Sequence, residues 1–268
     1  MIHIFGISGF LGSNLSNFLI KKKIKIKKYT SKTKIKNTHS TYDYKYLKTI
    51  EDNDLIIFFS GATSVTKIEK NNIKYLSFNR KIKKILNSIN LNTSIIYISS
   101  DYVYSGSKNL YRDSSKSDPI NFYGKLKEDI ENHIKKRFKK FLILRSPKIF
   151  SKKLDKDSIY SENYKKLINK EIIYAYEDQK IQLLNLTDFQ KIIFKIIKKN
   201  SIYGTYNLAG TLTSRYNFAL SIAKRYRLNA ALVFPTKLKK NNPFNLPYKL
   251  NLKTKLYKIV KFKLNYKI

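Results

Sequence analysis

A tyrosine and a lysine four positions apart, Tyr123 and Lys127, are the residues of this chain most suited to proton transfer. Residues at this spacing on a helix are neighbours on one face. A phenol has a pKa near 10, and an adjacent ammonium favours its ionised form by roughly 1 to 3 pKa units. We therefore expect Lys127 to lower the pKa of Tyr123 towards the range in which a general acid or base works best.

A serine hydroxyl completes this set. Ser100 follows an apolar segment at residues 94–98 that is typical of a buried strand. Ligands of open α/β sheets bind at the carboxyl ends of strands, so Ser100 is placed to polarise a substrate oxygen. A hydroxyl, a phenol and an amine suffice to move a proton to or from a carbonyl/alcohol pair. The sequence thus predicts Ser100, Tyr123 and Lys127 as catalytic residues for hydride chemistry with a nicotinamide cofactor. Tyr123 and Lys127 are also predicted cofactor contacts, with Lys127 bonding the ribose.

A glycine-rich turn follows the apolar segment at residues 2–5. Its glycines are Gly6, Gly9 and Gly12. This spacing lets the backbone turn tightly and approach a pyrophosphate at a helix N-terminus. We predict that Ser8 and the amides of Phe10 and Leu11 hold phosphate oxygens there, where the helix dipole is positive. The position after a strand and before a helix is the context that supports a dinucleotide-binding motif.

The cofactor type is predicted from the segment about twenty positions further on. An acidic residue there would bind the ribose 2′-hydroxyl and indicate NAD. Residues 27–32 contain no acid, and their lysines would tolerate a 2′-phosphate. We therefore predict a preference for NADP(H), with NAD(H) as the alternative.

The elements that position these residues alternate between apolar strands and amphipathic helices. We expect strands at residues 2–5, 24–26, 55–59, 94–98 and 141–144, and helices at residues 11–19, 73–89 and 121–138. Continuous apolar strands separated by helices indicate a parallel sheet covered on both faces. The predicted fold is α/β, a Rossmann-like doubly wound sheet.

The pattern is weaker after about residue 150. We expect a loop at residues 151–161, strands at 172–176 and 203–208, and helices at 189–198 and 216–226. The sequence thus predicts an NAD(P)-binding domain at residues 1–150 and a small substrate-binding lobe at residues 151–268, with parts of the chain crossing between the two.

Composition excludes several other classes of protein. The 268 residues are 42% hydrophobic, enough for a sizeable core, and include no cysteine, which rules out disulfides, thiolate catalysis and cysteine-based zinc sites. The three histidines are scattered, and we predict no metal site. No apolar run approaches the roughly 18 residues of a membrane span. We expect a cytoplasmic protein, because no signal-peptide pattern begins the sequence.

The formal net charge of +37 comes almost entirely from 48 lysines, beside only 7 arginines. Base and phosphate recognition favours the planar fork of arginine, and the lysines are spread through every segment. We interpret them as solvated surface and predict no specific nucleic-acid partner. Polyanion binding is the alternative, and it predicts a steep dependence on salt.

Longer motifs extend this interpretation to a family. They are Gly6-x-x-Gly9-x-x-Gly12, Ser100-Asp-Tyr-Val-Tyr-Ser-Gly106, Asn121-Phe-Tyr-Gly-Lys-Leu-Lys127, Leu144-Arg-Ser-Pro147 and Tyr203-Gly-Thr-Tyr-Asn-Leu-Ala-Gly210. With them the chain resembles the extended short-chain dehydrogenases/reductases, and among these the dTDP-4-dehydrorhamnose reductases and related epimerase/dehydratase enzymes. The resemblance covers most of the chain and is strongest up to about residue 150.

The resemblance implies an NAD(P)H-dependent reductase of a keto-sugar nucleotide, with Ser100, Tyr123 and Lys127 as its triad. It also implies that Asp43 lies near the adenine and that Asn79 matches a helix asparagine often found in the family. The segment that passes the cofactor would be Ser60, Gly61 and Ala62. The expected partner is a nucleotide-sugar substrate, with a homodimer as a candidate assembly.

One departure from the family helps to choose the reaction. Related 4,6-dehydratases carry Asp-Glu after the triad hydroxyl, whereas this chain has Asp101-Tyr102. Without that glutamate, ketone reduction is favoured over dehydration. Two alternatives stay open, an NAD-dependent nucleotide-sugar epimerase and a non-catalytic cofactor-binding subunit of the same fold.

Overall fold

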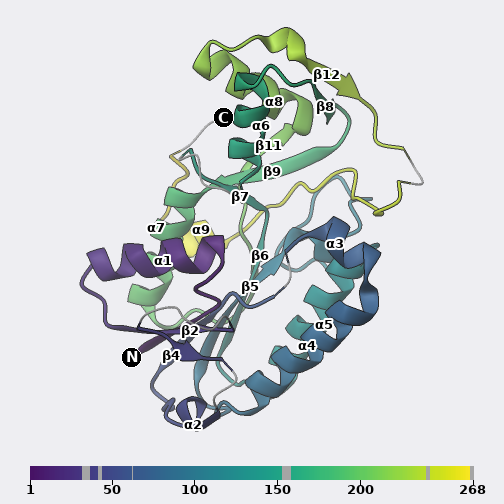
Figure 1. Ribbon diagram of the computed structural model, residues 1–268. Coiled ribbons are helices and arrows are strands. Elements are labelled where there is room, and N and C mark those ends of the chain that lie inside the picture. The colour runs from purple at the N-terminus through teal and green to yellow at the C-terminus, as the bar shows by residue number, and fades with distance from the viewer. Residues whose placement is uncertain (32–36, 42–43, 62, 153–157, 240–241, 266–268) are drawn as a thin grey trace. The chain divides into compact units, whose positions relative to one another are not determined.

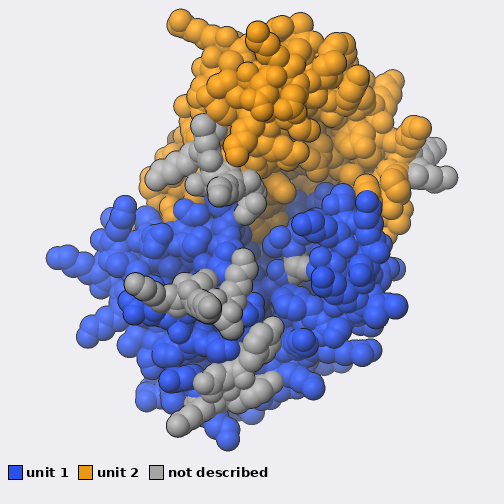
Figure 2. Space-filling model, viewed as in Figure 1, with its two compact units in different colours: residues 1–103, 121–145, 199–206 blue, residues 104–120, 146–198, 207–268 orange. Residues whose placement is uncertain are grey.

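The computed structural model describes residues 1–31, 37–41, 44–61, 63–152, 158–239 and 242–265. The chain forms two compact units, each built from several segments, and Figure 2 shows them in different colours. Unit 1 comprises residues 1–103, 121–145 and 199–206, and unit 2 comprises residues 104–120, 146–198 and 207–268. The roles of cofactor-binding domain and substrate-binding lobe stay predictions for these units.

A seven-stranded sheet forms the centre of unit 1. Its order is β10-β6-β5-β4-β1-β2-β3, and the pairs β2–β3, β1–β2, β1–β4 and β4–β5 are parallel. The strands are β1 (Ile2–Phe5), β2 (Ile26–Thr30), β3 (His39–Ser40), β4 (Leu55–Phe58), β5 (Ser94–Ser100), β6 (Phe141–Ser146) and β10 (Gly204–Asn207). Later strands add outward on both sides of β1. The predicted fold class, a doubly wound Rossmann-like sheet, is therefore confirmed.

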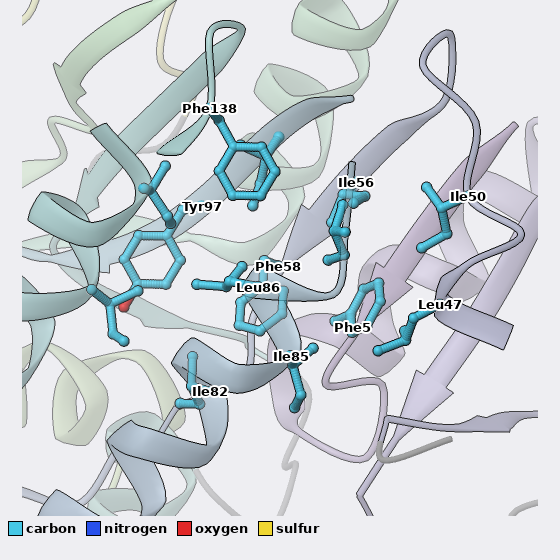
Figure 3. Close-up of a cluster of buried hydrophobic side chains, with 14 of the residues drawn as sticks. Phe5, Leu47, Ile50, Ile56, Phe58, Ile82, Ile85, Leu86, Tyr97 and Phe138 are labelled. Atoms are coloured by element: carbon cyan, nitrogen blue, oxygen red, sulfur yellow. The ribbon is translucent and has the colours of Figure 1, made fainter. Parts of the chain in front are cut away.

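The helices of unit 1 are α1 (Phe10–Lys21), α2 (Tyr44–Leu47), α3 (Val65–Lys70), α4 (Asn72–Asn87) and α5 (Phe122–Arg137), with a short 3-10 turn, η1 (Asp101–Val103). Helices α4 and α5 lie side by side against the sheet (Figure 1). Between them and the strands lies a core cluster of apolar side chains, in which Phe58 is fully buried and packs at 5.3 Å from the ring of Phe5 (Figure 3). Burying one such side chain contributes about 1.5–3 kcal/mol.

The strand expected at residues 24–26 is shifted in the structure. Lys23 has φ +58°, and its N–H donates to the carbonyl of Ile20 while that of Ile24 donates to the carbonyl of Leu19. These are the two hydrogen bonds of a Schellman cap, which closes α1. The alternation of isoleucine and lysine therefore begins in a helix cap, and β2 starts only at Ile26.

Unit 2 contains more regular structure than the sequence predicted. Its elements are β7 (Lys148–Phe150), α6 (Ile159–Ile168), β8 (Ile173–Tyr176), β9 (Lys180–Asn185), α7 (Leu186–Lys199), β11 (Thr211–Ser214), α8 (Arg215–Tyr226), η2 (Ala230–Leu232), β12 (Val233–Thr236) and α9 (Leu256–Ile259). The strands form a three-stranded sheet, β11-β9-β7, and a parallel pair, β12-β8. The loop was expected to extend to residue 161, but this boundary is wrong. Helix α6 begins at Ile159, and Ser158 caps it by accepting from the N–H of Ser161.

Candidate active site

The turn between β1 and α1 has a backbone conformation and packing that require glycine. Gly6 has φ +86°, a conformation that favours glycine. A Cβ atom added to Gly12 would lie 2.4 Å from the carbonyl oxygen of Gly6, whereas one added to Gly9 would meet that oxygen at 3.4 Å. The turn and the first turn of α1 are therefore packed directly against each other.

This turn fits a dinucleotide pyrophosphate. Gly9 is the N-cap of α1 and provides no side-chain cap, so the first amides of the helix, those of Phe10 and Leu11 included, point out of the helix end. Such amides, together with the helix dipole, bind anions. Ser8 is exposed beside them. The predicted contacts Asp43 and Ala62 lie outside the described residues.

The carboxyl ends of β1 and β4 meet beside the glycine turn. The N–H of Phe59 donates to the carbonyl of Phe5 at 3.0 Å, and a Cβ on Gly6 would lie 3.0 Å from the backbone nitrogen of Ser60. In an open α/β sheet, ligands bind where the strand order reverses, which here is between β1 and β4. The structure thus brings the predicted contact Ser60 to the same edge as the glycines.

Lys127 reaches this edge from α5. A Cβ on Gly61 would lie 3.0 Å from its Nζ, so glycine leaves room for the amine. The same Nζ lies 5.4 Å from the ring centre of Tyr97 and 5.9 Å from that of Tyr123. These residues, with Asn79, line a cavity of about 10 Å³, close to the space that one water molecule requires. Burial lowers the pKa of Lys127 to about 8, although the carboxylate of Glu131 acts in the opposite direction.

The hydroxyl of Ser100 acts on the phenol of Tyr123, and it lowers the pKa of that phenol. Ser100 Oγ also accepts from the N–H of Tyr102 at 3.2 Å and lies 3.2 Å from Asp101 Oδ1, to which it can donate. Since a hydroxyl carries one proton, Ser100 must release Asp101 before it can donate to another acceptor. Of the predicted catalytic residues, the structure therefore brings Ser100, Tyr123 and Lys127 together.

The pKa of Tyr123 differs from the expectation. Burial raises this pKa above its usual value near 10, the hydrogen bond with Ser100 partly lowers it, and the charge of Asp101 raises it further. Lys127 does not lower this pKa as expected: its own pKa of about 8 leaves the amine charged at neutral pH but neutral at the higher pH where Tyr123 would ionise. Tyr123 is therefore protonated at neutral pH and is suited to act as an acid.

The start of α5 is fixed by side chains from three segments. Asn121, its N-cap, accepts from the N–H of Gly124 at 2.8 Å. Glu69 of α3 accepts from the N–H of Tyr123 at 3.0 Å. Asn79 of α4, which is buried, donates to the carbonyl of Leu126 at 3.2 Å. These bonds hold the turn that carries Tyr123 and Lys127.

The sequence profile of the RmlD substrate binding domain matches residues 1–264. The chain belongs to this family. The predicted resemblance to dTDP-4-dehydrorhamnose reductases among the extended short-chain dehydrogenases/reductases is thereby confirmed. None of the curated proteins compared with the chain gives a significant match.

Solved structures with the same fold as this RmlD-family chain include reductases and an epimerase named for nucleotide-sugar substrates. A dTDP-4-dehydrorhamnose reductase from Bacillus anthracis, in complex with NADP, is 22% identical, with 98% of this chain and 93% of that chain covered and a TM-score of 0.85. A hypothetical dTDP-4-dehydrorhamnose reductase from Sulfolobus tokodaii is 24% identical over 98% and 96%, with a TM-score of 0.81. A UDP-glucose 4-epimerase from Thermus thermophilus, in complex with NAD, is 11% identical over 100% and 94%, with a TM-score of 0.79.

Sequence reasoning missed several residues of this RmlD-family site. Tyr97, under Lys127, was assigned only to a strand, and Glu69 lies far from the triad in sequence. Glu131 had a usable signal, because it follows Lys127 by four positions and thus lies on the same helix face.

Within the described ranges, no helix combines the length and apolar character that crossing a membrane would take.

Proposed function

We propose that this protein is an NADPH-dependent reductase of a keto-sugar nucleotide. The observation that carries the proposal is the buried amine of Lys127, 5.9 Å from the ring centre of Tyr123, whose pKa the hydroxyl of Ser100 lowers. These groups come from the same unit as the glycine turn, and Lys127 adjoins the strand edge that the turn occupies. Family membership and the nucleotide-sugar enzymes among the structural neighbours support the substrate class.

Bound NADPH would supply a hydride to the carbonyl carbon of the substrate. Tyr123 donates its phenolic proton to the carbonyl oxygen, so that one hydride and one proton give the alcohol. The raised pKa keeps this proton on Tyr123 until the oxygen gains negative charge. Ser100 then donates to the phenolate instead of Asp101, and the charge of Lys127 stabilises it. Exchange with solvent restores the proton on Tyr123.

The residue after Asp101 supports reduction rather than dehydration. Tyr102 packs edge-on against the ring of Tyr123, with ring centres 5.6 Å apart, at the position where related dehydratases carry a glutamate. A phenol at this place does not supply the carboxylate that a second acid–base pair would need. Elimination of water therefore lacks its second group.

NADPH is proposed over NADH because of the lysines in β2. Lys27 and Lys28 are partly exposed, and no acid is present between residues 27 and 32 to repel a 2′-phosphate. The Bacillus anthracis neighbour holds NADP, which agrees with this assignment, whereas the Thermus thermophilus epimerase holds NAD. Fluorescence titration with both dinucleotides tests the proposal, and tighter binding of NADH would contradict it.

Loss of NADPH absorbance across a panel of 4-keto-sugar nucleotides tests the reaction. We expect turnover with at least one member, near-complete loss in Tyr123→Phe, and unchanged NADPH affinity in that variant. Tyr174→Phe is the matched control, because Tyr174 is 70% exposed on β8. Interconversion of sugar nucleotides with retained NAD and no net NADPH oxidation would identify an epimerase instead.

The homodimer is part of the proposal, and light scattering of the purified protein tests it.

A further inference from the structure

Glu131 is a fully buried carboxylate behind the candidate active site. It lies on α5 and has no solvent exposure. Ser99 Oγ donates to its Oε1 at 2.6 Å, and Arg145 of β6 donates to it through Nε at 3.2 Å and Nη2 at 2.8 Å. Arg145 is 3% exposed, so both charges are removed from water. Lys135 adds a longer contact of 3.6 Å from the next turn of the helix.

The partners of Glu131 are neighbours of the proposed catalytic residues. Ser99 directly precedes Ser100 at the end of β5, and Glu131 follows Lys127 by one helical turn on α5. The hydrogen bond from Ser99 to Glu131 therefore joins the strand end that carries Ser100 to the helix that carries Tyr123 and Lys127.

Stability alone does not account for such a network. A buried ion pair often contributes no more than apolar side chains of the same volume, because desolvation opposes the attraction. A hydrogen-bonded carboxylate, however, fixes direction and distance in a way that apolar packing does not. The network thus fixes the distance and orientation between β5 and α5, the two elements that carry the three proposed catalytic residues.

We propose that Glu131 is a positioning residue, which through Ser99 sets the placement of α5 against β5 and so the approach of Tyr123 to Ser100. This inference rests on the proposed function and adds a role to it. A second effect of the same carboxylate is electrostatic, since its negative charge favours the protonated form of Lys127.

The other groups around Lys127 do not replace this charge. Tyr97 of β5 and Tyr123 of α5 face the amine with their rings, and burial raises the pKa of both phenols, so both are neutral at neutral pH. Asn79 of α4 is uncharged, and Gly61 presents only backbone.

Four further charged groups lie beyond this inner set. Asp129 pairs with Lys83 at 2.5 Å, and Asp101 lies beside Ser100 at the end of β5. Arg145 is paired with the carboxylate of Glu131. Among the described residues that face Lys127, Glu131 is therefore the carboxylate whose removal should change its titration.

Four variants separate positioning from charge. Ser99→Ala removes the link between strand and helix but keeps the carboxylate, and Ser99→Thr restores the hydroxyl. Glu131→Gln removes the negative charge that pairs with Arg145. The double variant E131Q/R145M removes both charges and guards against misfolding of the single variant. Glu162→Gln is the control, because Glu162 forms a similar i,i+4 contact with Lys166 on the surface of α6.

Three measurements are made on each variant. Steady-state kinetics with NADPH and the sugar nucleotide give kcat and KM, and thermal unfolding reports folding. Lysine-selective 13C labelling gives the titration of the Lys127 Cε resonance, which Lys127→Met assigns. This titration needs neither substrate nor cofactor, so it tests the charge effect even if the wild-type protein reduces no sugar nucleotide and the proposed function fails.

We expect kcat to fall about ten- to a hundredfold in Ser99→Ala with little change in KM, and to recover in Ser99→Thr. The titration of Lys127 should stay in place in Ser99→Ala and move to lower pH by about one unit in Glu131→Gln or E131Q/R145M. Glu162→Gln should change none of these quantities. Folded Ser99 and Glu131 variants with wild-type kcat and an unmoved Lys127 titration would overturn the proposal.

Discussion

The carboxylate of Glu69 accepts a hydrogen bond from the backbone N–H of Tyr123 at 3.0 Å, across 54 positions of sequence. Glu69 lies on α3, which follows the segment with Ser60 and Gly61, and Tyr123 lies in the first turn of α5. One side chain thus joins α3 to the turn of α5 that carries the proposed acid. The negative charge also lies at the positive end of the α5 dipole, where it is stabilising.

This bond predicts different effects for two substitutions of Glu69. In Glu69→Ala the N–H of Tyr123 loses its partner, and we expect a loss of stability of about 0.5–2 kcal/mol, as for the loss of a helix cap, with a reduced kcat. Glu69→Gln keeps an acceptor oxygen and should retain most of both. Denaturant unfolding and NADPH oxidation measure the two effects. Equal kcat values for Glu69→Ala and wild type would show that Tyr123 is positioned without Glu69.

The buried amine of Lys127 predicts a dependence of stability on pH. Its pKa is about 8 in the folded protein against 10.5 for the free side chain, so the unfolded chain binds more protons between these values. The free energy of unfolding should therefore rise with pH across this window, by up to about 3 kcal/mol, and this contribution is missing below pH 8.

Lys127→Met provides the reference for this prediction, because methionine keeps the apolar stem without the titrating group. Urea unfolding of both proteins between pH 7 and 10.5 gives the difference. We expect the wild-type protein to gain stability relative to Lys127→Met as the pH rises. A constant difference would mean that Lys127 titrates alike in the folded and unfolded chains.

Much of the sheet and one edge of the site were predictable, because their signals are local. The apolar run at residues 55–59 predicts a strand, and the structure has β4 there. The apolar residues 2–5 and the glycines that follow them predict a strand and a turn, and the structure has β1 there. The place of Ser100 at the end of β5 also followed, because an apolar strand precedes it in the sequence.

What the sequence could not supply depends on contacts between distant segments. The pKa of Tyr123 was expected to fall on the basis of its neighbour Lys127, but burial by the surrounding elements raises it instead. The helix α6 was missed because its N-cap, Ser158, stands in a polar segment that also suits a loop. The partner of Glu69 is set by tertiary packing, which periodicity does not report.

The core cluster predicts a large effect at Phe58. This side chain is fully buried between the strands and α4, next to Phe5 (Figure 3). Phe58→Ala should reduce the free energy of unfolding by about 3–5 kcal/mol, because it removes apolar contact and leaves a cavity. Tyr174→Ala, at an exposed position, should stay within about 0.5 kcal/mol of wild type. Denaturant unfolding measures both, and a similar loss in the two variants would contradict the assignment of this core.

The glycine turn allows a matched comparison of one substitution at two positions. A Cβ on Gly12 would lie 2.4 Å from the carbonyl oxygen of Gly6, which is backbone and cannot rotate away, whereas a Cβ on Gly9 would meet the same oxygen at 3.4 Å, an ordinary contact. We therefore expect Gly12→Ala to lose about 1–3 kcal/mol of stability, as overpacked sites do, and Gly9→Ala to lose little. Gly12→Ala should also weaken NADPH binding, since separation of the turn from α1 would move the amides of Phe10 and Leu11. Thermal unfolding and fluorescence titration measure both effects, and a Gly12→Ala protein as stable as Gly9→Ala would show that the turn is looser than its packing indicates.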